Sequence, residues 1–109
     1  MKKLFISQPM NGLTDEEILT ERISIKARAE KEIGEPVELI DSYFSEYPDS
    51  NIKNKGVWYL GKSLMKMAEA DIVYFGKHWE CARGCILEHM TAEAYELTIM
   101  EDKKHGTDN

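Results

Sequence analysis

Residues 3–40 read KLFISQPMNGLTDEEILTERISIKARAEKEIGEPVELI, and this stretch decides the fold. It opens with Lys3–Ser7, a short apolar run that a Gln-Pro pair ends, which is typical of a buried strand. Thr14–Glu17 has the spacing of a capping box, and apolar residues then recur on one helical face until Gly34. Pro36–Ile40 predicts a second strand, because proline suits the first position of a strand. The stretch therefore predicts a strand, a helix and a second strand.

The remaining sequence repeats this alternation after a polar interruption. Asp41–Gly56 has no periodicity and is long for a loop, which indicates either a functional segment or a short unrecognised helix. Val57–Ala70 has helical periodicity, and Asp71–Phe75 is a third apolar run. Arg83–Tyr95 predicts a third helix. Leu97–Met100 predicts a fourth strand, although the helix could also continue through it.

Alternating strands and helices with nearly continuous apolar strands predict a parallel sheet with right-handed crossovers. We expect a three-layer α/β domain of the Rossmann or flavodoxin-like class, with four parallel strands in the order 2-1-3-4. The length of 109 residues and an apolar content of 42% fit a single domain over residues 1–109. Residues 101–109 are polar and predict a frayed tail.

Composition excludes some partners. A net charge of −6 with scattered lysines argues against binding to a nucleic-acid polymer, which needs a basic face. No apolar run approaches the length that spans a membrane, and the first apolar run is too short for a secretion signal. With only two cysteines and no such signal, we expect a cytoplasmic protein with free thiols.

Glu88 occupies an unusual place in the segment WECARGCILE, residues 79–88. Steps of four and three residues place it on one helical stripe, which consists of Cys81, Cys85, Glu88, Ala92, Tyr95 and Ile99. Burial of an unpaired charge is unfavourable, so a glutamate on this stripe indicates a functional role. The alternative is a glutamate at the edge of the stripe with its carboxylate in solvent.

The same segment has residues that can ligate metals. Cys81, Cys85 and His89 recur every four residues, and His78 precedes them. Ligands on one side of one helix cannot surround a tetrahedral ion without ligands from elsewhere. Packed thiols and surface histidines are the favoured interpretation, and no metal is predicted.

Three segments should meet at the carboxyl ends of the strands, where α/β sheets bind ligands. They are Ser7–Gly12 after the first strand, residues 41–44 after the second and Gly76–Ala82 after the third, with Glu88 reaching them from the third helix. The aromatic residues near the second segment either pack within the loop or stack on a ligand ring. These residues are Tyr43, Phe44 and Tyr47.

The chain resembles the nucleoside 2-deoxyribosyltransferase-like superfamily, in particular its branch of small bacterial and phage proteins of unknown function. That branch has a Gly-Pro-Met-x-Gly turn after the first strand, which here is Gln8–Gly12. It also has Trp-Glu-x-Ser-Arg-Gly-x-x-x-Glu, which here is Trp79–Glu88. The resemblance extends from Lys3 to about Met100.

The resemblance implies that Glu88 attacks the anomeric carbon of a nucleoside or nucleotide and forms a glycosyl-enzyme, which a second base or water then resolves. It implies no cofactor. The leaving base would receive its proton from Asp41, from Tyr43 or from a neighbouring subunit. The resemblance and the three meeting segments together predict a set of substrate-binding residues: Ser7, Gln8, Pro9, Met10, Asn11, Gly12, Asp41, Tyr43, Trp79, Ala82, Arg83 and Gly84.

Three residues depart from the family pattern and leave a second function open. Gln8 stands where the family has glycine, Ala82 where it has serine, and Ser63 roughly where its enzymes have aspartate. The alternative to an enzyme is therefore a non-catalytic module that binds a nucleotide-like ligand or a partner protein. We also expect a homo-oligomer, most simply a dimer, because large apolar side chains such as Trp58 are many for so small a core.

Overall fold

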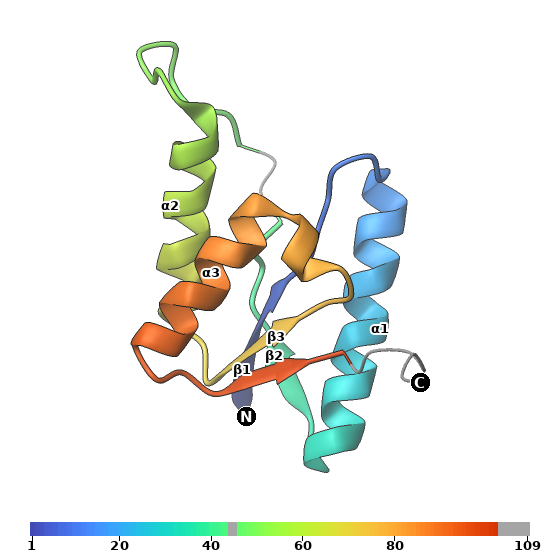
Figure 1. Cartoon of the computed structure of the whole chain (residues 1–109). Coiled ribbons are helices and arrows are strands. Elements are labelled where there is room, and N and C mark those ends of the chain that lie inside the picture. Colours follow the sequence, from blue (N-terminus) through green and yellow to red (C-terminus); the bar gives the residue numbers. More distant parts are fainter. Residues whose placement is uncertain (44–45, 103–109) are drawn as a thin grey trace.

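The computed structural model describes residues 1–43 and 46–102 (Figure 1). Within them, the strands form one parallel sheet in the order β2-β1-β3-β4, which confirms the predicted topology. The elements follow in the order β1 (Lys2–Ser7), α1 (Asp15–Ile33), β2 (Val37–Leu39), α2 (Lys55–Met67), β3 (Ile72–Phe75), the 3₁₀ helix η1 (Trp79–Cys81), α3 (Arg83–Ala94) and β4 (Ile99–Glu101).

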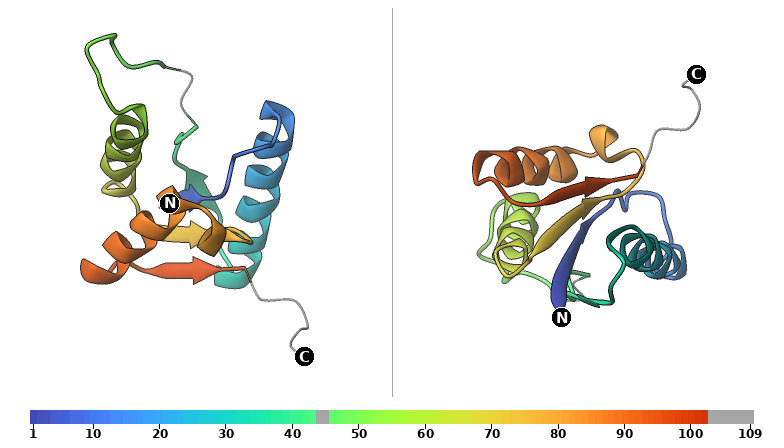
Figure 2. Two further views of the ribbon diagram at one scale, coloured as in Figure 1. Left: turned by 45° about the horizontal axis from the view of Figure 1, so that its top comes forward. Right: turned by 90° about the horizontal axis from the view of Figure 1, so that it is seen from below.

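The sheet lies between two helical layers, with α1 on one face and α2 and α3 on the other (Figure 2). Side chains of β1 alternate between these faces. Leu4 and Ile6 belong to the core cluster that contains Ile25 of α1, whereas Phe5 belongs to the cluster that contains Ala92 of α3. The same alternation places the side chain of Ser7 on the face that α3 covers.

Both termini of helix α1 lie where the sequence predicts. The backbone N–H of Glu17 donates to Thr14 Oγ1 at 3.1 Å, and the Thr14 N–H donates to Glu17 Oε1 at 2.8 Å, which completes the capping box. Gly34 adopts a left-handed conformation with φ of 77° and donates to the carbonyl of Glu30. A residue with a Cβ would be strained there, so glycine fixes the end of the helix.

Several predicted boundaries are wrong by one to three residues. The second and third strands are shorter than predicted, and α3 ends at Ala94 rather than Tyr95. Helix α2 begins two residues early, because the Asn54 side chain caps it by accepting from Val57 N at 2.9 Å, and it ends at Met67. Strand β4 begins two residues late, because the Leu97 N–H still bonds to the carbonyl of Ala92.

The predicted tail is ordered at its start. Glu101 is the last residue of β4, and the Asp102 carboxylate accepts hydrogen bonds from Arg28 Nε at 3.0 Å and from Lys77 N at 3.1 Å. Residues 103–109 of this prediction lie outside the described residues. Among the described residues, no helix has the length and apolar character needed to cross a membrane.

Candidate functional site

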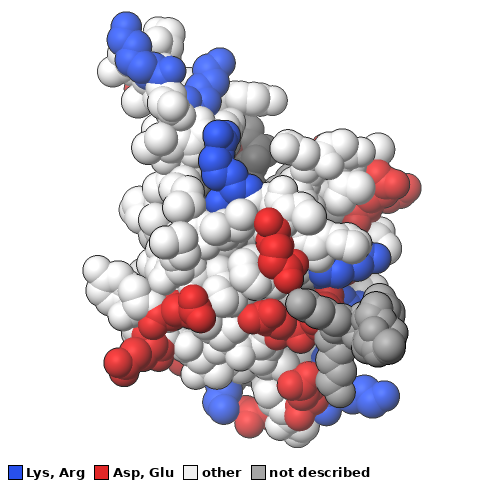
Figure 3. Space-filling model, in the orientation of Figure 1, with Lys and Arg blue, Asp and Glu red and all other residues white. Residues whose placement is uncertain are grey.

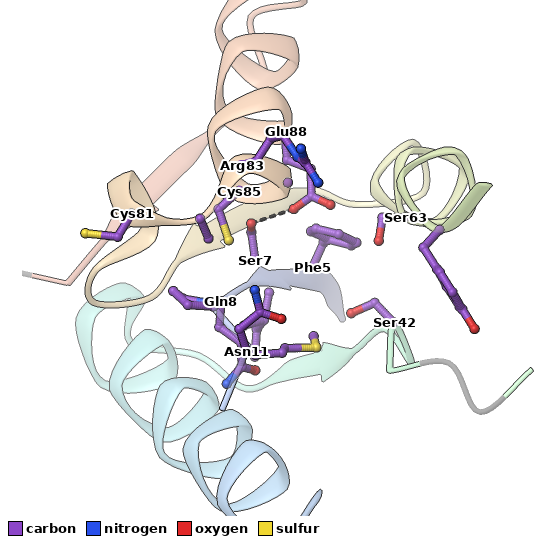
Figure 4. Close-up of a pocket in the computed structure, with 16 residues that line it drawn as sticks. Phe5, Ser7, Gln8, Asn11, Ser42, Ser63, Cys81, Arg83, Cys85 and Glu88 are labelled. Atoms are coloured by element: carbon purple, nitrogen blue, oxygen red, sulfur yellow. Dashed lines mark hydrogen bonds between the residues drawn. The ribbon is translucent and has the colours of Figure 1, made fainter. Parts of the chain in front are cut away.

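A cavity of about 740 Å³ opens at the carboxyl end of β1, between the start of α3 and the side of α2 (Figure 4). All three predicted segments contribute lining residues, the second through Ser42 alone. The predicted residues that line it are Ser7, Gln8, Pro9, Met10, Asn11, Ala82, Arg83, Gly84 and Glu88.

Glu88 is the buried acid of this cavity. Its side chain is in the protein interior with only 7% of the residue exposed, and Ser7 Oγ donates to its Oε1 at 2.5 Å. Desolvation raises the pKa of Glu88 above its usual range, and hydrogen bonds from the hydroxyls of Ser7 and Ser63 partly oppose this shift. The predicted buried position is confirmed. Two other members of the predicted stripe, Cys81 and Tyr95, are exposed, and Ile99 lies in β4 rather than on the helix.

The turn after β1 forms one wall of the cavity. Pro9 has no N–H to continue the ladder of the sheet. The Leu13 N–H then donates to the carbonyl of Met10 at 3.2 Å, across a turn in which Gly12 has a φ of 82°. Such a positive φ favours glycine. The turn therefore directs Pro9, Met10 and Asn11 towards the cavity, whereas Gly12 itself lies outside the lining.

The start of α3 forms the opposite wall. Ala82 is the N-cap residue and makes no side-chain capping bond, so the first N–H groups of the helix lack a cap. Arg83 is exposed at this end, and both residues line the cavity. Helix N-termini carry partial positive charge, so this wall favours a negatively charged ligand group. A Cβ added to Gly84 would meet no atom within 4 Å.

The two cysteines lie in different environments, since Cys85 is buried and Cys81 is exposed. Burial raises the pKa of the Cys85 thiol to about 11, and the nearby Glu88 carboxylate adds to the rise while Ser7 opposes it. A thiol with this pKa stays protonated at neutral pH and is a poor nucleophile. Cys81 points away from Glu88 in Figure 4. The part of the chain that the structure describes has no group of three His, Cys, Asp or Glu residues suited to a metal.

Four predicted binding residues lie outside the cavity lining, namely Gly12, Asp41, Tyr43 and Trp79. The Trp79 ring stacks on His89 with centroids 4.0 Å apart, and its Nε1 donates to Glu101 at 3.2 Å, so it packs α3 against β4. The Tyr43 hydroxyl donates to Asp15 of α1. Tyr47 is exposed, and Phe44 lies outside the described residues.

The cavity also has lining residues that were not among the predicted binding residues, which are Phe5, Ile6, Ser42, Tyr59, Ser63, Cys81 and Cys85. Ser42 lies three residues beyond the end of β2, in the segment 41–44 that was predicted to reach the site at the carboxyl ends of the strands. Tyr59 and Ser63 are one helical turn apart on α2, and a four-residue spacing in an amphipathic helix does not reveal which flank meets a cavity.

No family model, curated protein or solved structure matches this chain.

Proposed function

We propose that this protein transfers or hydrolyses the N-glycosidic bond of a nucleoside or nucleotide, with Glu88 as the nucleophile. The observation that carries this proposal is a buried carboxylate that lines an open cavity at the carboxyl edge of a parallel sheet. Burial of a carboxylate destabilises the fold unless other interactions offset the loss of hydration. The 2.5 Å hydrogen bond from Ser7 offsets part of this loss. The family resemblance of residues 8–12 and 79–88 adds the chemical class.

In the proposed reaction, a carboxylate oxygen of Glu88 forms a bond to the anomeric carbon while the bond from that carbon to the base nitrogen breaks. The electron pair of the broken bond goes to the base, which takes up a proton. In the second step, water or another base attacks the anomeric carbon, loses a proton and frees the Glu88 carboxylate. This scheme parallels that of a retaining glycosidase.

Ser7 has a positioning role in this scheme. A carboxylate must be ionised to attack carbon, and burial favours its protonated form. Hydrogen bonds from Ser7 and Ser63 favour the ionised form, so they act against desolvation. We therefore expect activity to rise with pH as Glu88 loses its proton, with the acidic limb above the usual range of a glutamate.

The leaving base needs a proton donor. Asp41 and Tyr43, the two predicted candidates within the chain, lie outside the cavity lining, and a neighbouring subunit is the third candidate. The wall at Ala82 and Arg83 supports an anionic group on the substrate, such as a 5′-phosphate. We propose no cofactor and no nucleic-acid polymer as partner.

We also propose that the protein acts as a homo-oligomer, most simply a two-fold dimer. Apolar side chains of α2 and α3 meet around a second hollow of about 350 Å³, which Val57, Leu60 and Leu87 help to line. Ile86 and Met90 extend this surface along α3. We name these five residues the apolar strip.

A second copy of the chain is the occupant that fits the apolar strip. Figure 3 shows that the face over α2 and α3 is largely uncharged between basic side chains above and acidic ones below. Copies that each have a net charge of −6 repel one another least through an uncharged surface. Arg83 and Gly84 line both the hollow and the candidate site, so a partner seated on the strip would adjoin the site.

A chromatographic end-point assay tests the proposed reaction. The four 2′-deoxynucleosides and their monophosphates are incubated with the protein, with and without free adenine as acceptor, and released or exchanged base is measured. We expect release or exchange with at least one substrate. Glu88→Gln should reduce turnover at least about a thousandfold, roughly 4 kcal/mol of transition-state stabilisation.

Glu93→Gln is the matched control, because Glu93 lies on the same helix with a 65% exposed side chain. It should retain wild-type turnover. Absence of any activity in the wild-type protein would instead favour the non-catalytic binding module.

A further inference from the structure

The cavity wall away from Glu88 has two buried polar side chains with unused hydrogen-bonding capacity. Gln8 is 5% exposed and Ser42 is 4% exposed, and both line the cavity. Figure 4 shows them on the other side of the end of β1 from Glu88. Among the described residues, neither Gln8 Oε1 nor Ser42 Oγ has a hydrogen-bond partner. Burial of a polar atom without a hydrogen bond is unfavourable, so two such atoms at one cavity indicate a ligand.

The orientation of the Gln8 amide is set by α1. Gln8 Nε2 lies 3.5 Å from the carbonyl oxygen of Ile18 and donates to it. The flipped amide would place two acceptor oxygens against each other. Oε1 therefore remains the free atom, and a carboxamide oxygen can only accept a hydrogen bond.

The stem of Gln8 lies beside Gly76. A Cβ added to Gly76 would lie 3.4 Å from Gln8 Cβ and 3.3 Å from Ile25 Cδ1. Gln8 and Ser42 together present an acceptor, oriented by the hydrogen bond to Ile18, and a hydroxyl that can donate or accept.

We propose that Gln8 and Ser42 form a base-recognition subsite for a nucleobase edge that presents an amino N–H donor beside an acceptor nitrogen, as adenine and cytosine do. Gln8 Oε1 accepts from the amino group, and the Ser42 hydroxyl donates to the neighbouring ring nitrogen. This assignment rests on the proposed function, since it takes the sugar to lie at Glu88 and the base to lie beyond it.

Binding measurements on full-length protein test the subsite. Isothermal titration in the Glu88→Gln background, which does not consume the ligand, compares 2′-deoxyadenosine with purine 2′-deoxyriboside, which lacks the amino group. The matching pyrimidine pair is 2′-deoxycytidine and 2-pyrimidinone 2′-deoxyriboside. We expect the amino-bearing member of at least one pair to bind at least about tenfold more tightly.

The variant Gln8→Met, of similar volume, should bind both members of that pair equally, because methionine cannot accept the hydrogen bond from the amino group that Gln8 Oε1 accepts. Ser42→Ala is a smaller change and should reduce the preference, which keeps the test open if Gln8→Met fails to fold. Tyr95→Phe, at the exposed end of α3, is the control and should keep the preference.

The outcomes separate the two proposals. Equal affinities within both pairs, or a preference that survives Gln8→Met and Ser42→Ala, would overturn the subsite even if the wild-type protein cleaves nucleosides. Absence of binding by every nucleoside would also overturn it. A Gln8-dependent preference without cleavage would support the subsite and remove the proposed enzymatic function.

Discussion

The ionised Glu88 carboxylate destabilises the folded chain, because it is buried. Its pKa in the folded chain is raised by desolvation, whereas in the unfolded chain it has the ordinary value of about 4. The folded state therefore holds the proton more tightly than the unfolded state. The stability that this tighter proton binding contributes is fully present below about pH 4 and is lost as pH rises through the folded-state pKa of Glu88.

Glu88→Gln should accordingly raise the free energy of unfolding at neutral pH while it removes activity. The amide keeps an oxygen to accept from Ser7 and has no charge to desolvate. Urea unfolding of both proteins between about pH 4 and pH 8 measures the effect, and the difference should grow with pH. A variant that becomes progressively less stable than wild type as pH rises would show that the carboxylate is stabilised by a charge partner instead.

The sequence predicted the burial of Glu88 but not its hydrogen bond to Ser7. The helical spacing from Cys85 to Ala92 was sufficient to place Glu88 on a buried face. Alternation along β1 places the side chains of Phe5 and Ser7 on the same face of the sheet. The contact between Ser7 and Glu88 follows only when that face is known to be the one that α3 covers. Trp79 could not be placed this way, because it lies in a 3₁₀ helix after a left-handed His78 and has no regular period to follow.

At the scale of elements, the start of α3 decides how closely a ligand can approach. Gly84 lies in the first turn, and a methyl group there would meet no protein atom within 4 Å. Gly84→Ala should therefore leave stability unchanged or increase it by up to about 1 kcal/mol, since alanine is the better helix former. It should lower kcat/KM by about tenfold or more, because the methyl group occupies space where Gly84 lines the cavity.

Gly61→Ala is the matched control for this change. Gly61 lies within α2, has the same open surroundings and is not part of the cavity lining. Both variants are compared by thermal unfolding and steady-state kinetics. Wild-type kcat/KM in Gly84→Ala would mean that the substrate does not approach this turn.

The order of elements was predictable because the signals for helices and strands are local. Thr14, Glu17 and Gly34 fix the ends of α1 by their own hydrogen bonds and backbone angles. The end of β4 depends on Arg28 and Lys77, which are distant in sequence from Asp102, so no local pattern indicates it. The place of Ser42 at the site depends on β2 lying beside β1, a tertiary feature that the alternation of strands and helices did predict.

At the scale of the whole molecule, the apolar strip predicts self-association. Multi-angle light scattering should give a dimer or higher oligomer at high micromolar concentration, and a monomer there would contradict the proposal. Leu87→Glu should dissociate it, because a charge would be buried at the interface. Leu19→Glu is the control, since Leu19 is 46% exposed on α1, on the opposite helical layer, and Leu87 is 39% exposed.

Covalent participation of Glu88 is tested most directly by intact-protein mass spectrometry after rapid acid quench with a substrate that the chromatographic assay identifies. The predicted result is a mass increase of one deoxyribosyl group, located by peptide mapping on Glu88. It should be absent from Glu88→Gln and present in Glu93→Gln. Turnover by Glu88→Gln at the wild-type rate, or an adduct on a different residue, would contradict the assignment of Glu88 as the nucleophile.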